Sequence, residues 1–167
     1  LPSPGRAAAG GRRAVRALGE ASGAACRALG IHRDLAPVVD LDRPDGLLSR
    51  QSRCLSDDPE RVVTLARVFA EGLRSWCVAG CLKHFPGLGA VVVDTHETLP
   101  VLDLEPAELD RHLEVFADLS VDIPIVMIGH VVVPAMGDTD RPASLSRAVV
   151  ESDLRLPGGP VGLSDDL

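Results

Sequence analysis

Four groups of polar side chains in this sequence could take part in chemistry: Lys83-His84, Asp94-Thr95-His96, His130 and Ser164-Asp165-Asp166. Histidine titrates near neutral pH, so it can both give and take a proton. A carboxylate two residues away, as Asp94 is from His96, can orient the imidazole ring and stabilise its charged form. Carboxylates can also act as nucleophiles, and lysine donates hydrogen bonds to hydroxyl oxygens.

Each group also has a purely structural interpretation. An Asp-x-His pair on a loop is more often a turn with a solvated histidine. The pair Asp165-Asp166 could cap the N-terminus of a helix. Lys83-His84 could be a solvated strand end, and His130 could be a hydrogen-bonded core histidine.

A metal site is a further alternative, because His84, Asp94 and His96 are all common ligand types. Cys77 and Cys81 have a metal-like spacing, but the residues between them are apolar and no second ligand pair with zinc-like spacing follows. We interpret both cysteines as buried free thiols. We therefore expect neither a metal nor a cofactor.

The polar groups follow short apolar segments. Periodic apolar positions predict helices over 12–29, 59–76, 106–119 and 146–154. Apolar runs predict strands over 35–41, 78–82, 123–128 and 161–163, while the Pro/Gly-rich residues 1–11 are predicted to be a loop. The polar residues past these strand ends are Asp40 and Asp42, Lys83 and His84, His130, and Asp165 and Asp166.

This order predicts an α/β fold, a partial (β/α)8 TIM barrel with about four parallel strands. A barrel keeps its active site at the carboxyl ends of its strands, where the polar residues fall. An open doubly wound sheet does the same, but no glycine fingerprint follows the first strand. A whole barrel needs ~250 residues. We therefore expect residues 1–167 to be a single partial domain, cut at both ends.

The composition limits the kinds of partner that we expect this protein to bind. The formal net charge is -7 and no basic stripe is present, so we expect no nucleic-acid partner. No apolar run reaches the ~18 residues of a membrane helix, and no secretory signal is visible. The cysteine pattern weakly favours a reducing compartment, so we expect a cytoplasmic protein.

One long motif is specific. Residues 83–100, KHFPGLGAVVVDTHETLP, resemble the KHFPGHG-x-x-x-x-DSH-x-x-LP stretch of glycoside hydrolase family 3, most closely its bacterial β-N-acetylhexosaminidase subgroup. Four other segments are similar to the same family in the same order: LAPVVDLDR, SRCLSDDPERV, MIGHVVVPAMGDTDRPASLS and GLSDDL. Five ordered segments are far more specific than any single motif.

The resemblance implies roles for individual residues. Asp165 matches the family's nucleophile, His96 the acid/base histidine of the hexosaminidase subgroup, and Asp94 its partner. Such a pair would cleave a glycosidic bond by retaining double displacement.

Substrate contacts follow from the same resemblance. Lys83, His84 and Arg53 match residues that hold sugar hydroxyls, and His130 matches a histidine near the same pocket. The expected partner is a small carbohydrate that contains N-acetylglucosamine. We expect it to derive from peptidoglycan and to be cleaved during peptidoglycan recycling.

Two departures from the family pattern keep other hypotheses open. Leu88 stands where the family motif has its second histidine, so one polar group near the sugar is missing. The family's DQEGG segment does not occur in this sequence. The alternatives are a catalytically inactive fragment or sugar-binding remnant, and a family 3 β-glucosidase. The edges of a partial sheet also predict self-association.

Overall fold

A computed structural model of the chain describes residues 1–93 and 99–165. Within this part, a three-stranded sheet has the order β1 (Leu82–Phe85), β2 (Ile125–Ile128) and β3 (Val161–Ser164). Both strand pairs are parallel, and each connection contains a helix, α5 (Pro106–Leu119) or α6 (Arg147–Leu154). The predicted α/β class with parallel strands is confirmed.

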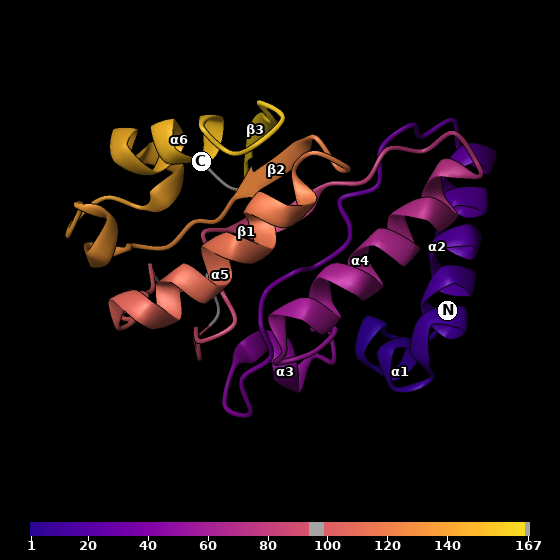
Figure 1. Cartoon of the computed structure of the whole chain (residues 1–167), viewed down its shortest axis with the longest axis horizontal. Coiled ribbons are helices and arrows are strands. Elements are labelled where there is room, and N and C mark those ends of the chain that lie inside the picture. The colour runs from indigo at the N-terminus through magenta and orange to yellow at the C-terminus, as the bar shows by residue number, and fades with distance from the viewer. Residues whose placement is uncertain (94–98, 166–167) are drawn as a thin grey trace.

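The long helices lie one after another in chain order (Figure 1). Helix α4 (Pro59–Arg74) packs against both α2 (Gly11–Ala28) and α5. Helix α5 lies against β1, and α6 lies against β2 and β3. In Figure 1, α2 and α4 run side by side, and α6 lies at the other end beside β3.

Two glycines set the close crossing of α2 and α4. A Cβ atom on Gly19 would lie 2.3 Å from the carbonyl oxygen of Phe69. A Cβ atom on Gly72 would lie 2.7 Å from the carbonyl oxygen of Arg16. The two backbones can approach this closely only because neither glycine carries a side chain.

The later helices begin where local signals place them. Asp58 caps α4 by accepting the N–H of Glu60 at 3.1 Å, and Ser146 caps α6 by accepting the N–H of Val149 at 3.4 Å. Proline occupies the first turn of α4 and α5. The predicted helices over these segments are confirmed.

The N-terminal loop prediction is wrong. The structure has helix α1 (Pro4–Ala9) there, with the hydroxyl of Ser3 accepting the N–H of Arg6 at 3.4 Å. Ala7 and Ala8 bury their side chains in the core, which stabilises the helix. Gly10 lies between α1 and α2, and Gly11, the first residue of α2, has a φ of 78°.

The first two strand predictions need correction. The segment 35–41 joins the sheet only through an isolated bridge between Val38 and Lys83. The strand predicted over 78–82 lies later, as β1, so Lys83 and His84 belong to the strand itself. Strand limits depend on the partner strands, which the local sequence does not contain. Three short helices occupy segments without a predicted element: α3 (Leu47–Arg50), η1 (Pro134–Met136) and η2 (Ala143–Leu145).

The core is aliphatic apart from a few aromatic rings. Phe85 on β1 meets Phe116 on α5 in an edge-to-face contact, with ring centroids 5.2 Å apart. Val15, Leu73 and Val126 are fully buried around the same core. None of the described helices is long and apolar enough to cross a membrane.

The cysteines are all free thiols, as predicted. Cys54 and Cys81 are buried, but Cys77 is exposed, so the prediction of a buried thiol is wrong at that position. Cys77 follows the end of α4 in a turn with a φ of 54°, which turns its side chain away from the core.

Candidate active site

The candidate site lies where the carboxyl ends of the strands meet. The N–H of Val39 donates to the carbonyl oxygen of Lys83 at 2.9 Å, which places Asp40 beside β1. The N–H of Asp165 donates to the carbonyl oxygen of Ile128 at 3.0 Å, which places Asp165 beside the end of β2. Residues far apart in the chain thus meet at the carboxyl ends of the strands.

A buried hydrogen bond joins Asp40 and His84. Oδ2 of Asp40 lies 2.8 Å from Nδ1 of His84 and accepts the backbone N–H of His84 at 3.1 Å. Oδ1 accepts the N–H of Leu88 at 2.6 Å. Burial alone would raise the pKa of Asp40, but His84 and the two backbone N–H groups outweigh it and hold this pKa below its usual value.

His84 is therefore no solvated strand end. The residue is only 4% exposed, and Asp40 is completely buried. Sequence reasoning noted Asp40 as an acid at a strand end but gave it no partner. The available signal was an acid that follows one apolar segment, with Lys-His following the next.

Lys83 lies in the electrostatic field of three other charged residues. Burial lowers the pKa of Lys83, and the positive charge of Arg53 lowers it further. The carboxylates of Asp165 and Asp40 act in the opposite direction. Arg53 and Asp165 therefore both lie within electrostatic reach of Lys83.

His130 follows β2 and is half-buried. Its Nδ1 lies 3.0 Å from the hydroxyl oxygen of Ser144, on the connection to α6. The preceding Gly129 lies against His84, because a Cβ atom at position 129 would be 3.2 Å from Cβ of His84. His130 therefore lies at the same end of the sheet as Asp40 and His84, where the strands have their carboxyl ends.

Leu88 takes a different role from the polar residue that its position suggested. Its side chain is 4% exposed and belongs to the hydrophobic core, while its N–H is held by Asp40. At this position the backbone provides the polar contact and the side chain provides packing.

Asp94 and His96 lie outside the described residues. The structure does describe how the chain leads toward them: the N–H of Leu47 donates to the carbonyl of Val91 at 2.8 Å, and the Arg50 guanidinium donates to the carbonyl of Val92 at 2.7 Å. Within the described part, no three His, Cys, Asp or Glu side chains could hold a metal ion. The metal alternative depends on Asp94 and His96 and stays untested.

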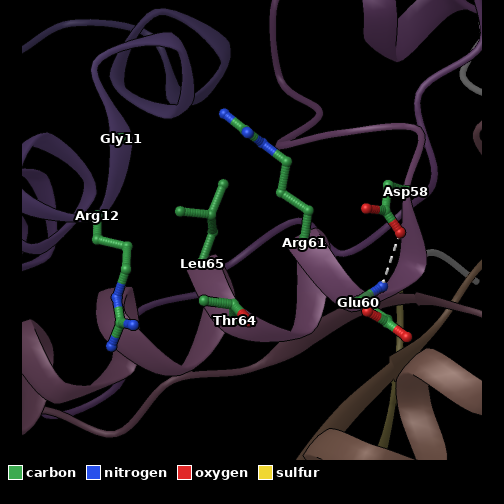
Figure 2. A pocket seen from close by; sticks show the side chains of 7 residues that line it. All are labelled: Gly11, Arg12, Asp58, Glu60, Arg61, Thr64 and Leu65. Atoms are coloured by element: carbon green, nitrogen blue, oxygen red, sulfur yellow. Dashed lines mark hydrogen bonds between the residues drawn. The ribbon is translucent and has the colours of Figure 1, made fainter.

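A separate hollow lies between the start of α2 and the start of α4 (Figure 2). It has a volume of about 380 Å³ and contains none of the predicted site residues. In Figure 2, Arg12 and Arg61 stand on either side of Leu65, and Asp58 accepts the N–H of Glu60.

A second hollow, of about 250 Å³, adjoins the candidate site on the side of α5. It includes His112, whose ring is buried and whose Nδ1 has no hydrogen-bond partner among the described residues. Burial lowers the pKa of His112. A Cβ atom on Gly87 would lie 2.6 Å from this nitrogen, so His112 packs directly against the turn after β1.

Known proteins resemble this chain in sequence and in structure. A β-hexosaminidase of Xanthomonas euvesicatoria is 34% identical over 158 residues, which cover 92% of this chain and 46% of that protein. The crystal structure of the β-N-acetylhexosaminidase from Beutenbergia cavernae superposes with a TM-score of 0.88 at 31% identity, over 100% of this chain and 52% of that one.

A third relative was crystallised with a sugar derivative. NagZ from Neisseria gonorrhoeae, in complex with N-trifluoroacetyl-D-glucosamine, superposes with a TM-score of 0.88 at 30% identity, covering 100% of this chain and 52% of that one. The chain thus spans about half the length of the relatives it matches. The neighbours' folds agree with the predicted relation to a barrel.

A family model gives the broadest match. The model described as "Glycosyl hydrolase family 3 N terminal domain" matches residues 3–164. Together with the fold and the strand-end residues, this match shows that the chain belongs to glycosyl hydrolase family 3.

Proposed function

We propose that the natural protein hydrolyses terminal β-linked N-acetylglucosamine from peptidoglycan-derived glycosides with retention of configuration. The observation that carries this proposal is that Lys83 interacts electrostatically with both Asp165 and Asp40, at the carboxyl ends of the strands, where Asp40 also binds His84. The similarity to β-hexosaminidases supports N-acetylglucosamine as the sugar.

The reaction has two steps, with Asp165 as nucleophile and His96 as acid/base group. In the first step, a carboxylate oxygen of Asp165 attacks the anomeric carbon. The bond to the leaving oxygen breaks, and protonated His96 gives that oxygen its proton. In the second step, His96 takes a proton from water, the water oxygen attacks the anomeric carbon, and Asp165 is released. Asp94 orients the His96 ring throughout.

Lys83, His84, Arg53 and His130 hold the sugar in this proposal. Fixing the sugar brings the anomeric carbon in line with the attacking oxygen, which is a large part of the rate gain in such reactions. The chemistry needs no metal and no cofactor.

Trapping of the covalent intermediate tests the nucleophile. An N-acetylglucosaminyl fluoride with fluorine also at C5 forms the glycosyl-enzyme and slows its hydrolysis. Peptide mass spectrometry of the natural protein should find the label on Asp165. The Asp165→Asn variant should stay unlabelled and lose roughly a thousand-fold or more of its activity. A label on another residue, such as the buried Asp40, would refute the assignment.

The choice of sugar has its own test. Rates on aryl β-N-acetylglucosaminide and aryl β-glucoside separate the proposed function from a family 3 β-glucosidase. We expect a clear preference for the N-acetylated substrate. Equal rates, or faster cleavage of the glucoside, would contradict it.

Location and self-association complete the proposal. Four free cysteines support a cytoplasmic location, which cell fractionation tests. Strand β3 is an edge of the described sheet, and Val161 on it is 60% exposed, which supports association through this edge. Analytical ultracentrifugation over a range of concentrations should show dimers, whereas a monomer at every concentration would contradict the association.

A further inference from the structure

The carboxylate of Asp40 is surrounded by hydrogen-bond donors. It accepts two backbone N–H groups, those of His84 at 3.1 Å and Leu88 at 2.6 Å, and it contacts Nδ1 of His84 at 2.8 Å. Asp40 has no exposed surface at all. The two backbone N–H groups stabilise the ionised form of this buried carboxyl group, and an ionised carboxylate only accepts hydrogen bonds.

This arrangement decides where the His84 ring carries its hydrogen. Because Asp40 only accepts, Nδ1 must be the donor in the 2.8 Å contact. A neutral imidazole has a single N–H, so the other nitrogen, Nε2, then holds a lone pair. Asp40 therefore excludes the neutral form of His84 with hydrogen on Nε2.

Nε2 of His84 is the part of the ring that stays open. No hydrogen bond reaches Nε2 from any described residue, and Nε2 is not among the fully buried polar atoms without a partner. The side chain of His84 as a whole is 5% exposed, so a small part of it reaches solvent.

We infer that Asp40 is a positioning residue that fixes His84 in the Nδ1–H form, and that neutral His84 accepts a hydrogen bond at Nε2 from a hydroxyl group of the sugar. This inference rests on the proposed function, which makes His84 a sugar-binding residue. Lys83 next to it can only donate hydrogen bonds. Lys83 would therefore bind the oxygen of a sugar hydroxyl group, whereas His84 would bind the hydrogen of one. Such a pair would distinguish a hydroxyl group from a group that cannot donate.

A spectroscopic measurement tests whether Asp40 fixes His84 in the Nδ1–H form, and it needs no turnover of substrate. Long-range ¹H–¹⁵N spectra of the natural protein distinguish the two ring nitrogens of His84, with the His84→Gln variant providing the assignment. We expect a protonated Nδ1 and, in the neutral ring, an unprotonated Nε2. A His84 ring that carries hydrogen on Nε2, whether neutral or doubly protonated, would overturn the inference.

The Asp40→Asn variant can reverse the direction of the hydrogen bond, because an amide N–H₂ can donate to Nδ1. We expect this variant to lose the strict Nδ1–H form in the same spectra. The matched control is Asp42→Asn, because Asp42 lies on the same segment and makes no hydrogen bond to His84. The control should keep the native pattern of ring nitrogens.

Substrate analogues test the proposed hydrogen bond from a sugar hydroxyl group to Nε2 of His84. Replacing one sugar hydroxyl at a time with fluorine, at C3, C4 or C6, removes a donor but leaves a weak acceptor. At one of these positions, kcat/KM of the native protein should fall roughly 10-fold more than kcat/KM of Asp40→Asn. The inductive effect of fluorine is common to both proteins and cancels in this comparison. Asp42→Asn should respond as the native protein does.

The outcomes separate this inference from the proposed function. If the native protein cleaves N-acetylglucosaminides but no fluorine position distinguishes it from Asp40→Asn, the hydroxyl contact is refuted and the proposed function stands. If it cleaves none of them, the proposed function fails, while the ring spectra still decide the role of Asp40. Should Asp40→Asn not fold, the spectrum of the native protein alone decides that role.

Discussion

Asp153 on α6 faces Gly162 on β3 so closely that a Cβ atom at position 162 would lie 2.7 Å from Oδ2 of Asp153. Asp153 is completely buried, and neither carboxylate oxygen has a hydrogen-bond partner among the described residues. Burial raises the pKa of Asp153 to about 6. A buried, unpaired carboxyl group thus lies against β3, the strand that leads to Asp165.

Asp153 should make stability depend on pH. Its pKa is about 6 in the folded chain against 3.8 in the unfolded chain, so the folded state holds the proton more tightly. This contribution is complete below pH 4 and is lost as the pH rises toward 6, at a cost of roughly 3 kcal/mol. The Asp153→Asn variant should therefore be more stable than the native protein at pH 7.5.

Urea unfolding at pH 4, 5, 6 and 7.5 measures this difference. The gain of Asp153→Asn should shrink steadily as the pH falls, while the exposed Asp118→Asn control shows no such trend. A gain that stays constant with pH would refute the buried carboxyl group as its source.

Gly89 should tolerate no side chain. A Cβ atom there would lie 1.9 Å from the carbonyl oxygen of Leu41, which is a backbone atom and cannot turn aside. Gly89→Ala should cost roughly 2 kcal/mol or more in the free energy of unfolding. Gly30→Ala is the comparison: its φ of 73° is strained but nothing lies within 4 Å, so about 1 kcal/mol is expected. Equal losses would contradict the steric explanation.

The cysteines should differ sharply in reactivity. Cys77 is exposed, whereas burial raises the pKa of Cys81 to about 11 and raises that of Cys54 even further. Since the thiolate is the reactive form, native protein at pH 8 should be alkylated at Cys77 at least roughly 100-fold faster than at Cys81. Peptide mapping after timed iodoacetamide treatment measures these rates, and denatured protein, where they should converge, is the control.

His96 should matter most for poor leaving groups. If it protonates the leaving oxygen, His96→Ala should lower kcat/KM roughly 100-fold or more for phenyl N-acetylglucosaminide. A dinitrophenyl leaving group needs no proton, so its kcat/KM should change little. Equal losses on both substrates would show that His96 is not the acid.

Local signals in the sequence determined the later helices and the family to which the chain belongs. The cap at Asp58 and the prolines that begin α4 and α5 act within a few residues of themselves, so the sequence alone locates them. The same holds for the ordered motifs, including the acid after Ser164, because a motif match needs no structure.

Only the tertiary structure decided which of these residues meet. Asp40 and His84 are 44 residues apart, and their contact depends on how the segment before Asp40 pairs with β1. The limits of β1, the burial of Leu88 and the exposure of Cys77 also differ from what local pattern alone suggests. Strand pairing and burial are set by partners that are distant in the chain, and a local sequence pattern carries no information about them.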